Sequence, residues 1–386
     1  MDLFKLDAHQ ITVNLRQITP HIHFQHFEKG ATLRASEVKP KLDKFIEKID
    51  AKEKIDAKKY KEWRDKENGS LKYKMSFSPK GRATIEEPVK PRGLYFGNMG
   101  VEPGKERMTV FYPQGIEMHL TSQNTDLLEY IKGILPYFFA LHAFGTRSSK
   151  GFGCYMVERA RLDFQKLKSY TPLETFYSIK YPTPINAAVL QDIWVLSNLM
   201  KGGINYSFRN PNYYYKGHIF KYFTPKGIGS EKAFIKRKIL PGDLDISLDS
   251  ESKKNYNEYR FVRAMLGLAD NYEFRRNRRT RRGGKVKVSH KEIERFESPI
   301  SFRAYENELL IVPQIIPKKM LNTLFTFENE RRTHVETIKT PDSFDIIDFM
   351  DSFVDDFNNE SIDMFSWDRQ TSGSAIYNKD LLITKH

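Results

Sequence analysis

The stretch from Thr125 to Phe144 constrains the fold most, because its apolar residues recur at the spacing of an α-helix. The stripe is wide and consists of Leu127, Leu128, Ile131, Ile134, Leu135, Phe138, Phe139 and Leu141. A helix with so broad an apolar face must be buried against a sheet or a second helix. Pro136 lies inside the stretch and predicts a kink.

The segments around this helix predict a small α+β domain. A strand is expected over 11–18 and a helix, capped by Ser36, over 36–49. Residues 108–112 and 116–120 look like a hairpin, and a strand is expected over 154–164. The order strand, helix, two strands, helix, strand is a split βαβ arrangement, which predicts a ferredoxin-like (RRM-like, βαββαβ) sandwich.

A chain of 386 residues favours two domains. We expect an N-terminal ferredoxin-like domain at 1–170 with an inserted arm at 50–104, because glycine, proline and lysine punctuate that stretch. A C-terminal domain at 171–340 would carry a basic loop at 270–290. Its predicted elements include a helix over 186–200, a strand-like segment over 219–223 and a hairpin over 299–313. Residues 341–386 form an acidic tail, with an amphipathic helix over 343–357 that presents Phe344, Ile347, Met350 and Val354.

Charge and cysteine content restrict the partners and the compartment. The net charge is +14, yet the tail from Pro341 holds ten acidic and three basic residues. The rest of the chain is therefore strongly basic, which favours polyanionic partners over small-molecule substrates. The single cysteine, Cys154, excludes an internal disulfide and fits a reducing cytoplasm. We see no signal peptide and no membrane-spanning run.

A glycine-rich stretch follows the long helix and is the most informative segment for function. Three glycines in nine residues allow positive φ angles, and a bend of this kind can present backbone N–H groups to phosphate oxygens. The candidate phosphate contacts are Gly145, Arg147, Ser148, Ser149, Lys150, Gly151 and Gly153. The alternative is a plain turn with two solvated cations. The spacing matches neither a Walker loop nor a dinucleotide-binding fingerprint.

Two other groups of cations could contact a polyanion. Arg34, Lys39 and Lys41 stand near the start of the expected first helix, where an anion is favoured. A second group lies between residues 275 and 287, which contain eight cations and no acid. Its arginines are Arg275, Arg276, Arg278, Arg279, Arg281 and Arg282. The alternatives are a solvated first turn for the first group, and contact with an acidic neighbouring subunit for the second.

Histidines raise the question of catalysis. His21, His23 and His26, followed by Glu28, could act as a general base or hold a metal ion. His21 and His23 alternate as strand residues do, and no cysteine or aspartate completes a strong ligand set. The sequence therefore favours a protein without catalytic residues, metal or cofactor.

Several of these segments resemble motifs of the RAMP superfamily, the RNA-binding proteins of CRISPR effector complexes. The helix, the glycine loop 145–153 and the strand that follows resemble the family's glycine-rich loop, and Leu33–Asp43 resembles its first-helix motif. Leu94-Tyr95-Phe96-Gly97 also matches, as do Arg263–Leu268 and Ser298-Pro299-Ile300 in the second half. A glycine loop in mid-chain followed by a second domain is most similar to the first Cmr subunit of type III-B systems.

The resemblance implies a second RAMP domain and an antiviral role as an RNA-binding structural subunit. Its partners would be guide RNA, target RNA as a further ligand, and other effector subunits. It also implies that Arg34 lies near the RNA path. Two other functions stay open: a metal-independent endoribonuclease that processes guide RNA, and a subunit whose basic run binds an acidic neighbour.

Overall fold

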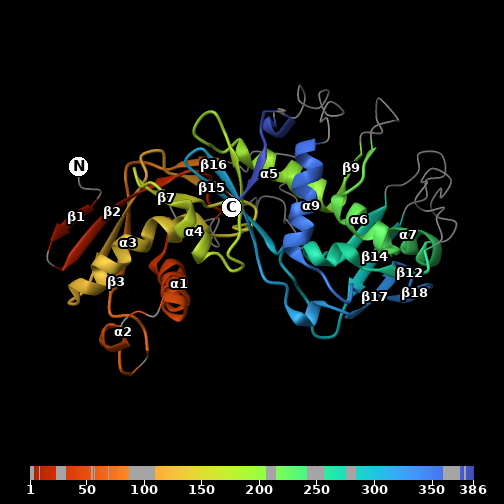
Figure 1. Cartoon of the computed structure of the whole chain (residues 1–386), viewed down its shortest axis with the longest axis horizontal. Helices are drawn as coiled ribbons and strands as arrows, with labels where there is room; N and C mark the ends of the chain where they lie inside the picture. Colours follow the sequence, from red (N-terminus) through yellow and green to blue (C-terminus); the bar gives the residue numbers. More distant parts are fainter. Residues whose placement is uncertain are drawn as a thin grey trace. The chain divides into compact units, whose positions relative to one another are not determined.

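The computed structural model describes residues 4–7, 9–22, 32–53, 55, 57–67, 69–86, 109–205, 214–240, 256–274, 284–359, 374–377 and 380–386. The motif at 94–97 and part of the expected arm at 50–104 lie outside these ranges. The chain is a mixed α/β protein with several antiparallel sheets (Figure 1). It divides into two compact units: residues 1–193, 301–312 and 369–386 form the first, and 194–300 and 313–368 the second.

The central sheet of the first unit is antiparallel throughout. Its strand order is β7 (Tyr155–Val157), β2 (Gln10–Gln17), β6 (Ile116–Thr121) and β3 (Lys74–Pro79), and β1 (Phe4–Asp7) pairs with the first half of β2. Helices α1 (Ala35–Glu53) and α3 (Thr125–Leu141) pack on this sheet. Ile11, Val13 and Leu15 of β2 point into this core and are buried, whereas Thr12 and Asn14 alternate with them and stay half-exposed.

The expected hairpin over 108–120 is wrong, although its turn forms. Gly115 donates to the carbonyl of Tyr112, but β5 (Thr109–Phe111) pairs with β4 (Thr84–Glu86) and not with β6. The buried amide of Gln17 explains the difference, because it donates to the carbonyl of Val110 and accepts from the N–H of Tyr112. The end of β2 thus holds β5 outside the main sheet.

Two element boundaries also differ from the prediction. The helix α1 begins at Ala35, with the N–H groups of Glu37 and Val38 donating to the carbonyl of Arg34, so Ser36 is not its cap. The strand expected over 154–164 ends at Val157. There the chain turns at Arg159, whose φ is 63°, and Asp163 caps the helix α4 (Phe164–Tyr170).

A second sheet of the first unit joins segments that are far apart in the sequence. Its order is β15 (Ile300–Tyr305), β16 (Glu308–Pro313), β8 (Tyr177–Lys180) and β19 (Ile383–Lys385), so the hairpin predicted over 299–313 is confirmed. The buried carboxylate of Asp192 accepts hydrogen bonds from the Tyr181 hydroxyl at 2.8 Å and the Ser374 hydroxyl at 2.5 Å. These contacts fasten the C-terminal segment to the body of the unit.

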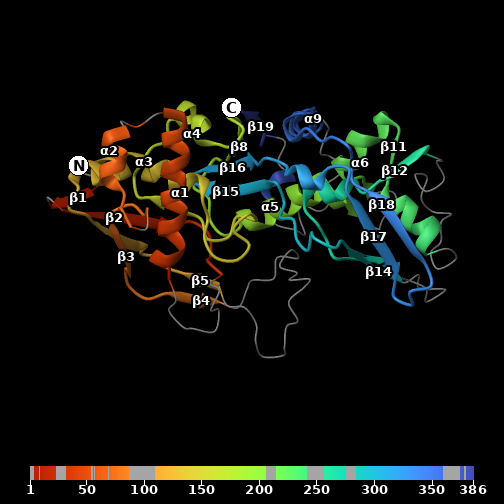
Figure 2. The same cartoon turned by 90° about the horizontal axis from the view of Figure 1, so that it is seen from below.

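The second unit is built around an antiparallel sheet. It consists of β13 (Asn271–Phe274), β14 (Gly284–Ser289), β17 (Leu324–Asn329) and β18 (Val335–Lys339), and Figure 2 shows β14, β17 and β18 side by side. The strand expected over 219–223 is wrong, because these residues belong to helix α6 (His218–Phe223). Their aromatic content favoured a strand, but the rings of Tyr222 and Phe223 pack against Phe344, which overrides that preference.

The acidic amphipathic helix is present as α9 (Ile346–Asn359), and of the four apolar residues predicted to be presented, Phe344 and Met350 are buried. Ile346, Phe349, Met350, Phe353 and Phe357 are buried, whereas Ile347 and Val354 are half-exposed. His218 of α6 lies 2.9 Å from the Asp356 carboxylate and 3.1 Å from the Ser352 hydroxyl. This helix therefore packs on a helix of its own chain that carries His218 and Lys221, whose ammonium lies 3.4 Å from Asp356.

The remaining elements are short. The α-helices and strands are α2 (Ala57–Trp63), α5 (Val189–Ser197), α7 (Glu231–Phe234), β9 (Ile204–Asn205), β10 (Tyr214–Tyr215), β11 (Ile228–Ser230) and β12 (Glu258–Arg260). The π-helical turns are η1 (Asn198–Gly202) and η3 (Ile235–Ile239). The 3-10 turns are η2 (Thr224–Lys226), η5 (Val262–Leu266), η6 (Lys318–Met320) and η8 (Ala375–Tyr377). The helix expected over 186–200 is formed by α5 and η1. No helix among the described residues is both long and apolar enough to cross a membrane.

Candidate nucleic-acid interface

The glycine loop 145–153 connects the end of α3 to β7 and depends on left-handed backbone angles. Gly145, Gly151 and Gly153 have φ angles of 79°, 80° and 66°, and Arg147 has a φ of 59°. A Cβ atom at Gly153 would overlap the carbonyl of Phe144, and one at Gly145 would overlap the carbonyl of Ile22. The glycines are therefore required for the backbone path itself.

The N–H groups of the loop are largely engaged within the chain. Gly145 donates to the Glu37 carboxylate at 2.8 Å, and Gly153 donates to the carbonyl of Pro20 at 2.8 Å. Lys150 and Gly151 donate back to Arg147 and Ser148, at 2.9 Å and 3.3 Å. These N–H groups therefore stabilise the bend, and contact between the loop and phosphate stays a prediction. Residues 147–150 between these contacts are called the tip of the loop below.

Strand β15 lies along the inner side of this loop. The N–H of Phe302 donates to the carbonyl of Ser149 at 3.1 Å, and Lys150 forms a bridge with Phe302. The guanidinium of Arg303, which is 9% exposed, donates to the carbonyls of Ser148 at 2.7 Å and Leu141 at 2.9 Å. Our reading of the sequence missed Arg303. An arginine in a strand whose other residues, over 300–305, are uncharged was the signal that could have found it.

The start of α1 reaches the same loop through one carboxylate. Glu37 accepts from Gly145 and, at 3.0 Å, from the ammonium of Lys41. That ammonium also donates to the carbonyl of Ala143 at 3.3 Å and lies 4.8 Å from the centre of the Phe144 ring. The structure therefore brings Lys41 and the glycine loop together.

The expected cluster of Arg34, Lys39 and Lys41 does not form. Lys39 makes an ion pair with Asp43 at 2.8 Å, donates to the carbonyl of Leu71 and lies 4.0 Å from the centre of the Tyr73 ring. Residues two apart on a helix point in different directions, so Lys39 and Lys41 diverge. Arg34 is exposed immediately before the helix. Their contact with RNA stays a prediction.

Positive charge is concentrated around the loop. Burial, together with the neighbouring guanidinium of Arg147, lowers the pKa of Lys150 to about 8. Burial also lowers the pKa of His142 to about 3, and Arg303 and Lys41 contribute to this shift. The charges of Arg303 and Lys41 thus add to the effect of burial in disfavouring the protonated form of His142. A phosphate group would relieve the repulsion between Arg147 and Lys150.

His21 is part of the core below the loop. Its side chain is buried, its Nδ1 lies 3.1 Å from the hydroxyl of Tyr155, and it supports the bend at Gly145. The hypothesis of His21 as a general base is therefore disfavoured, because a substrate hydroxyl must lie within hydrogen-bond reach. His23, His26 and Glu28 lie outside the described residues. Within the part of the chain that the structure describes, no group of three His, Cys, Asp or Glu could hold a metal ion.

The basic run 275–287 follows β13 in the sequence, and its last residues, from Gly284 on, belong to β14. Phe274, the last residue of β13, pairs with Gly284, the first residue of β14, and the ammonium of Lys285 lies 3.9 Å from the Glu273 carboxylate. Residues 275–283 lie outside the described ranges. The RNA contacts predicted for these residues therefore stay predictions.

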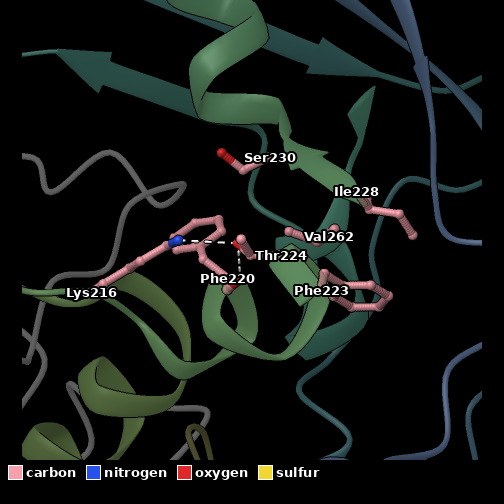
Figure 3. Close-up of a pocket in the computed structure, with 7 residues that line it drawn as sticks. All are labelled: Lys216, Phe220, Phe223, Thr224, Ile228, Ser230 and Val262. Atoms are coloured by element: carbon pink, nitrogen blue, oxygen red, sulfur yellow. Dashed lines mark hydrogen bonds between the residues drawn. The ribbon is translucent and has the colours of Figure 1, made fainter. Parts of the chain in front are cut away.

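A small pocket in the second unit does not offer an alternative site. Figure 3 shows it lined by Lys216, Phe220, Phe223, Thr224, Ile228, Ser230 and Val262. The ammonium of Lys216 donates to the Thr224 hydroxyl at 3.1 Å across it. Its volume of about 10 Å³ has room for about one water molecule. A nucleotide does not fit there.

Comparison with known proteins gives a family match and similarity to solved structures, two of which are described below. The sequence model of the Cmr1 N-terminal domain matches residues 8–204, and that of the Cmr1 C-terminal domain matches residues 214–373. A chain of the cryo-EM structure of the type III-B Cmr-beta complex bound to cognate target RNA matches at 13% identity with a TM-score of 0.28. That match covers 39% of this chain and 59% of the other, so it spans less than two thirds of that protein.

The second structure is the crystal structure of Cmr1 from Pyrococcus furiosus in its apo form. It matches at 10% identity with a TM-score of 0.37, and the match covers 80% of this chain and 89% of the other. No curated protein matches the chain.

Proposed function

The chain belongs to the Cmr1 family, and from this premise we propose that it is an RNA-binding subunit of a type III-B CRISPR effector complex. It would hold the backbone of guide RNA, and of target RNA as a further ligand, beside other effector subunits, without cleaving either. The observation that carries the proposal is the packing of Arg147 and Lys150 in one loop, where burial and the neighbouring guanidinium lower the pKa of Lys150.

The surroundings of the loop support this proposal. Arg147 and Lys150 lie at the tip of a bend whose inner side is fixed by Glu37 and Arg303. A rigid bend with two cations suits phosphate, because its charges need no rearrangement on binding. We extend the proposal to a ferredoxin-like RAMP fold for the first unit, which is supported by the strand order β7, β2, β6, β3 and by the packing of α1 and α3 on this sheet. The hydroxyls of Ser148 and Ser149 would add donors at the same tip.

The test replaces the two cations while keeping the backbone. We choose Arg147→Gly, because glycine adopts the φ of 59° without strain, and Lys150→Met, because methionine keeps the length of the side chain. The double variant should weaken RNA binding for all sequences alike and reduce the slope of log affinity against log salt by up to about two units.

Matched controls separate charge at the loop from charge in general. Arg159→Gly removes an exposed arginine that also has a positive φ, of 63°, and Lys166→Met removes a lysine of the neighbouring helix α4. Both should lower RNA affinity much less than the loop variants. An unchanged affinity and salt slope in the double loop variant would exclude this loop from the RNA interface.

The endoribonuclease hypothesis is the alternative and has a direct test. Purified protein is incubated with end-labelled repeat RNA in the presence of a metal chelator. Our proposal expects intact RNA. Specific cleavage that is lost in His23→Ala or His26→Ala would replace the proposal with guide-RNA processing.

A further inference from the structure

We propose that Arg303 is a positioning residue, which sets the direction in which the tip of the glycine loop presents its donors. Arg303 belongs to β15 and is separated from Ser148 by 155 positions in the sequence. Its effect on RNA rests on the proposed function of the loop. Its effect on the loop backbone does not.

The contacts of Arg303 join three parts of the first unit. Its Nε donates to the carbonyl of Leu141, the last residue of α3, where a cation is favoured by the helix dipole. Its Nη1 donates to the carbonyls of Ser148 and Phe302, at 2.7 Å each. One guanidinium therefore links the end of α3, the tip of the loop and its own strand.

The direction of the Ser148 carbonyl decides the direction of the next N–H. In a trans peptide the C=O and N–H bonds point to opposite sides, and the described part of the chain contains no cis peptide. Because the carbonyl of Ser148 points inward to Arg303, the N–H of Ser149 points outward. This N–H lies between Arg147 and Lys150 in the sequence, where a phosphate would be held.

Neighbouring residues of β15 hold the same register. Phe302 donates to the carbonyl of Ser149, and the N–H of Ala304 lies 3.4 Å from Sγ of Cys154, which immediately follows the loop. Tyr305 donates to the carbonyl of Ala160 at 3.2 Å. β15 therefore follows the chain from the loop to the residues after β7, and Arg303 is its contact with the tip.

Lysine cannot replace arginine in this role. The planar guanidinium reaches Leu141 from Nε and Ser148 from Nη1 at once, whereas an ammonium is a single nitrogen on a flexible chain. We therefore expect Arg303→Lys to keep the positive charge and lose the position of the loop. Arg303→Met removes both.

The first measurement is hydrogen exchange of the loop without RNA. The N–H groups of Lys150 and Gly151 donate to Arg147 and Ser148, so they report whether the bend is formed. In Arg303→Lys and Arg303→Met these N–H groups should exchange at least about tenfold faster, which is the loss expected for one hydrogen bond to a charged group. The strand pair β2 and β6 should exchange as in the wild type, which shows that the variant is folded.

The second measurement is RNA affinity against salt. Arg303→Lys should weaken binding about as much as Arg303→Met and should give the same salt slope, because Arg303 faces the loop carbonyls and not phosphate, so its charge alone restores nothing. Arg161→Met, which removes an exposed arginine of the same unit, is the control for charge.

Two outcomes would overturn the proposal. Loop N–H groups that exchange as in the wild type in both variants would show that Arg303 does not position the bend. A salt slope reduced by about one unit in Arg303→Met, and restored in Arg303→Lys, would make Arg303 a phosphate contact instead. If the wild type binds no RNA, the proposed function fails while the exchange measurement still decides the role of Arg303.

Discussion

At the scale of single residues, the charge of Lys150 lowers the stability of the fold that holds it. Its ammonium is packed beside Arg147 and lies 5.9 Å from the centre of the Phe302 ring, in surroundings that disfavour its charge. The folded protein holds this proton less tightly than the unfolded chain does, because the pKa falls from 10.5 to about 8. Under the proposed function, such a group would be retained for its ligand rather than for stability.

Replacing Lys150 with methionine should therefore stabilise the protein while weakening RNA binding. The unfavourable contribution of Lys150 is complete below about pH 8 and disappears as the pH rises towards 10.5, where both states lose the proton. Urea unfolding of the wild type and Lys150→Met should differ more at pH 7 than at pH 9.5. A variant that is less stable than the wild type at pH 7 would contradict this account of Lys150.

At the scale of elements, the loop is defined as much by its neighbours as by its glycines. Segment 19–22 accepts hydrogen bonds from it, α1 holds its first residue, Gly145, and β15 holds its tip. Its glycines remove Cβ atoms where the backbone passes closest to Phe144 and Ile22. The glycine content predicted a bend, but the residues that contact the bend come from elsewhere in the chain.

Two glycine substitutions should have opposite effects on stability. Gly153→Ala combines a positive φ with a Cβ that overlaps the Phe144 carbonyl, so it should destabilise by at least about 2 kcal/mol. Gly133 lies on the exposed side of α3 with open space around it. Gly133→Ala should stabilise by about 0.5–1 kcal/mol, since alanine favours a helix. Denaturant midpoints measure both, and a tolerated Gly153→Ala would refute the close approach.

At the scale of the whole molecule, the cations of the glycine loop and those of the basic run belong to different compact units. Loop 145–153 is in the first unit, and the run 275–282 follows β13 of the second. If one RNA contacts both, the second contact forms within a complex already made. The binding free energies of the two contacts then combine.

The length of the RNA should reveal whether both groups of cations contact it. Changing the six arginines of 275–282 to glutamine should weaken binding of long RNA, and the loss should add to that of the loop variants. An RNA too short to reach both surfaces should show one loss only, measured across a series of RNA lengths. If RNA affinity is unchanged while binding to an acidic partner subunit is lost, the run is a protein contact instead.

The sequence by itself determined those elements that depend only on residues close together along the chain. Neighbouring residues determine the apolar stripe of α3, the turn at 113–115 and the left-handed glycines after α3, because helical spacing and φ angles are local properties. The amphipathic helix α9 and the hairpin of β15 and β16 were also predictable in this way. Family membership follows from the sequence too.

Only the tertiary structure decided which distant groups meet. Arg303 reaches Ser148, Glu37 reaches Gly145, and Gln17 draws β5 away from β6, and no local pattern encodes these partners. It also turned 219–223 into a helix, because packing against Phe344 outweighed the strand preference of aromatic residues. Long-range contacts depend on where whole elements pack, and spacing along the chain carries no information about that.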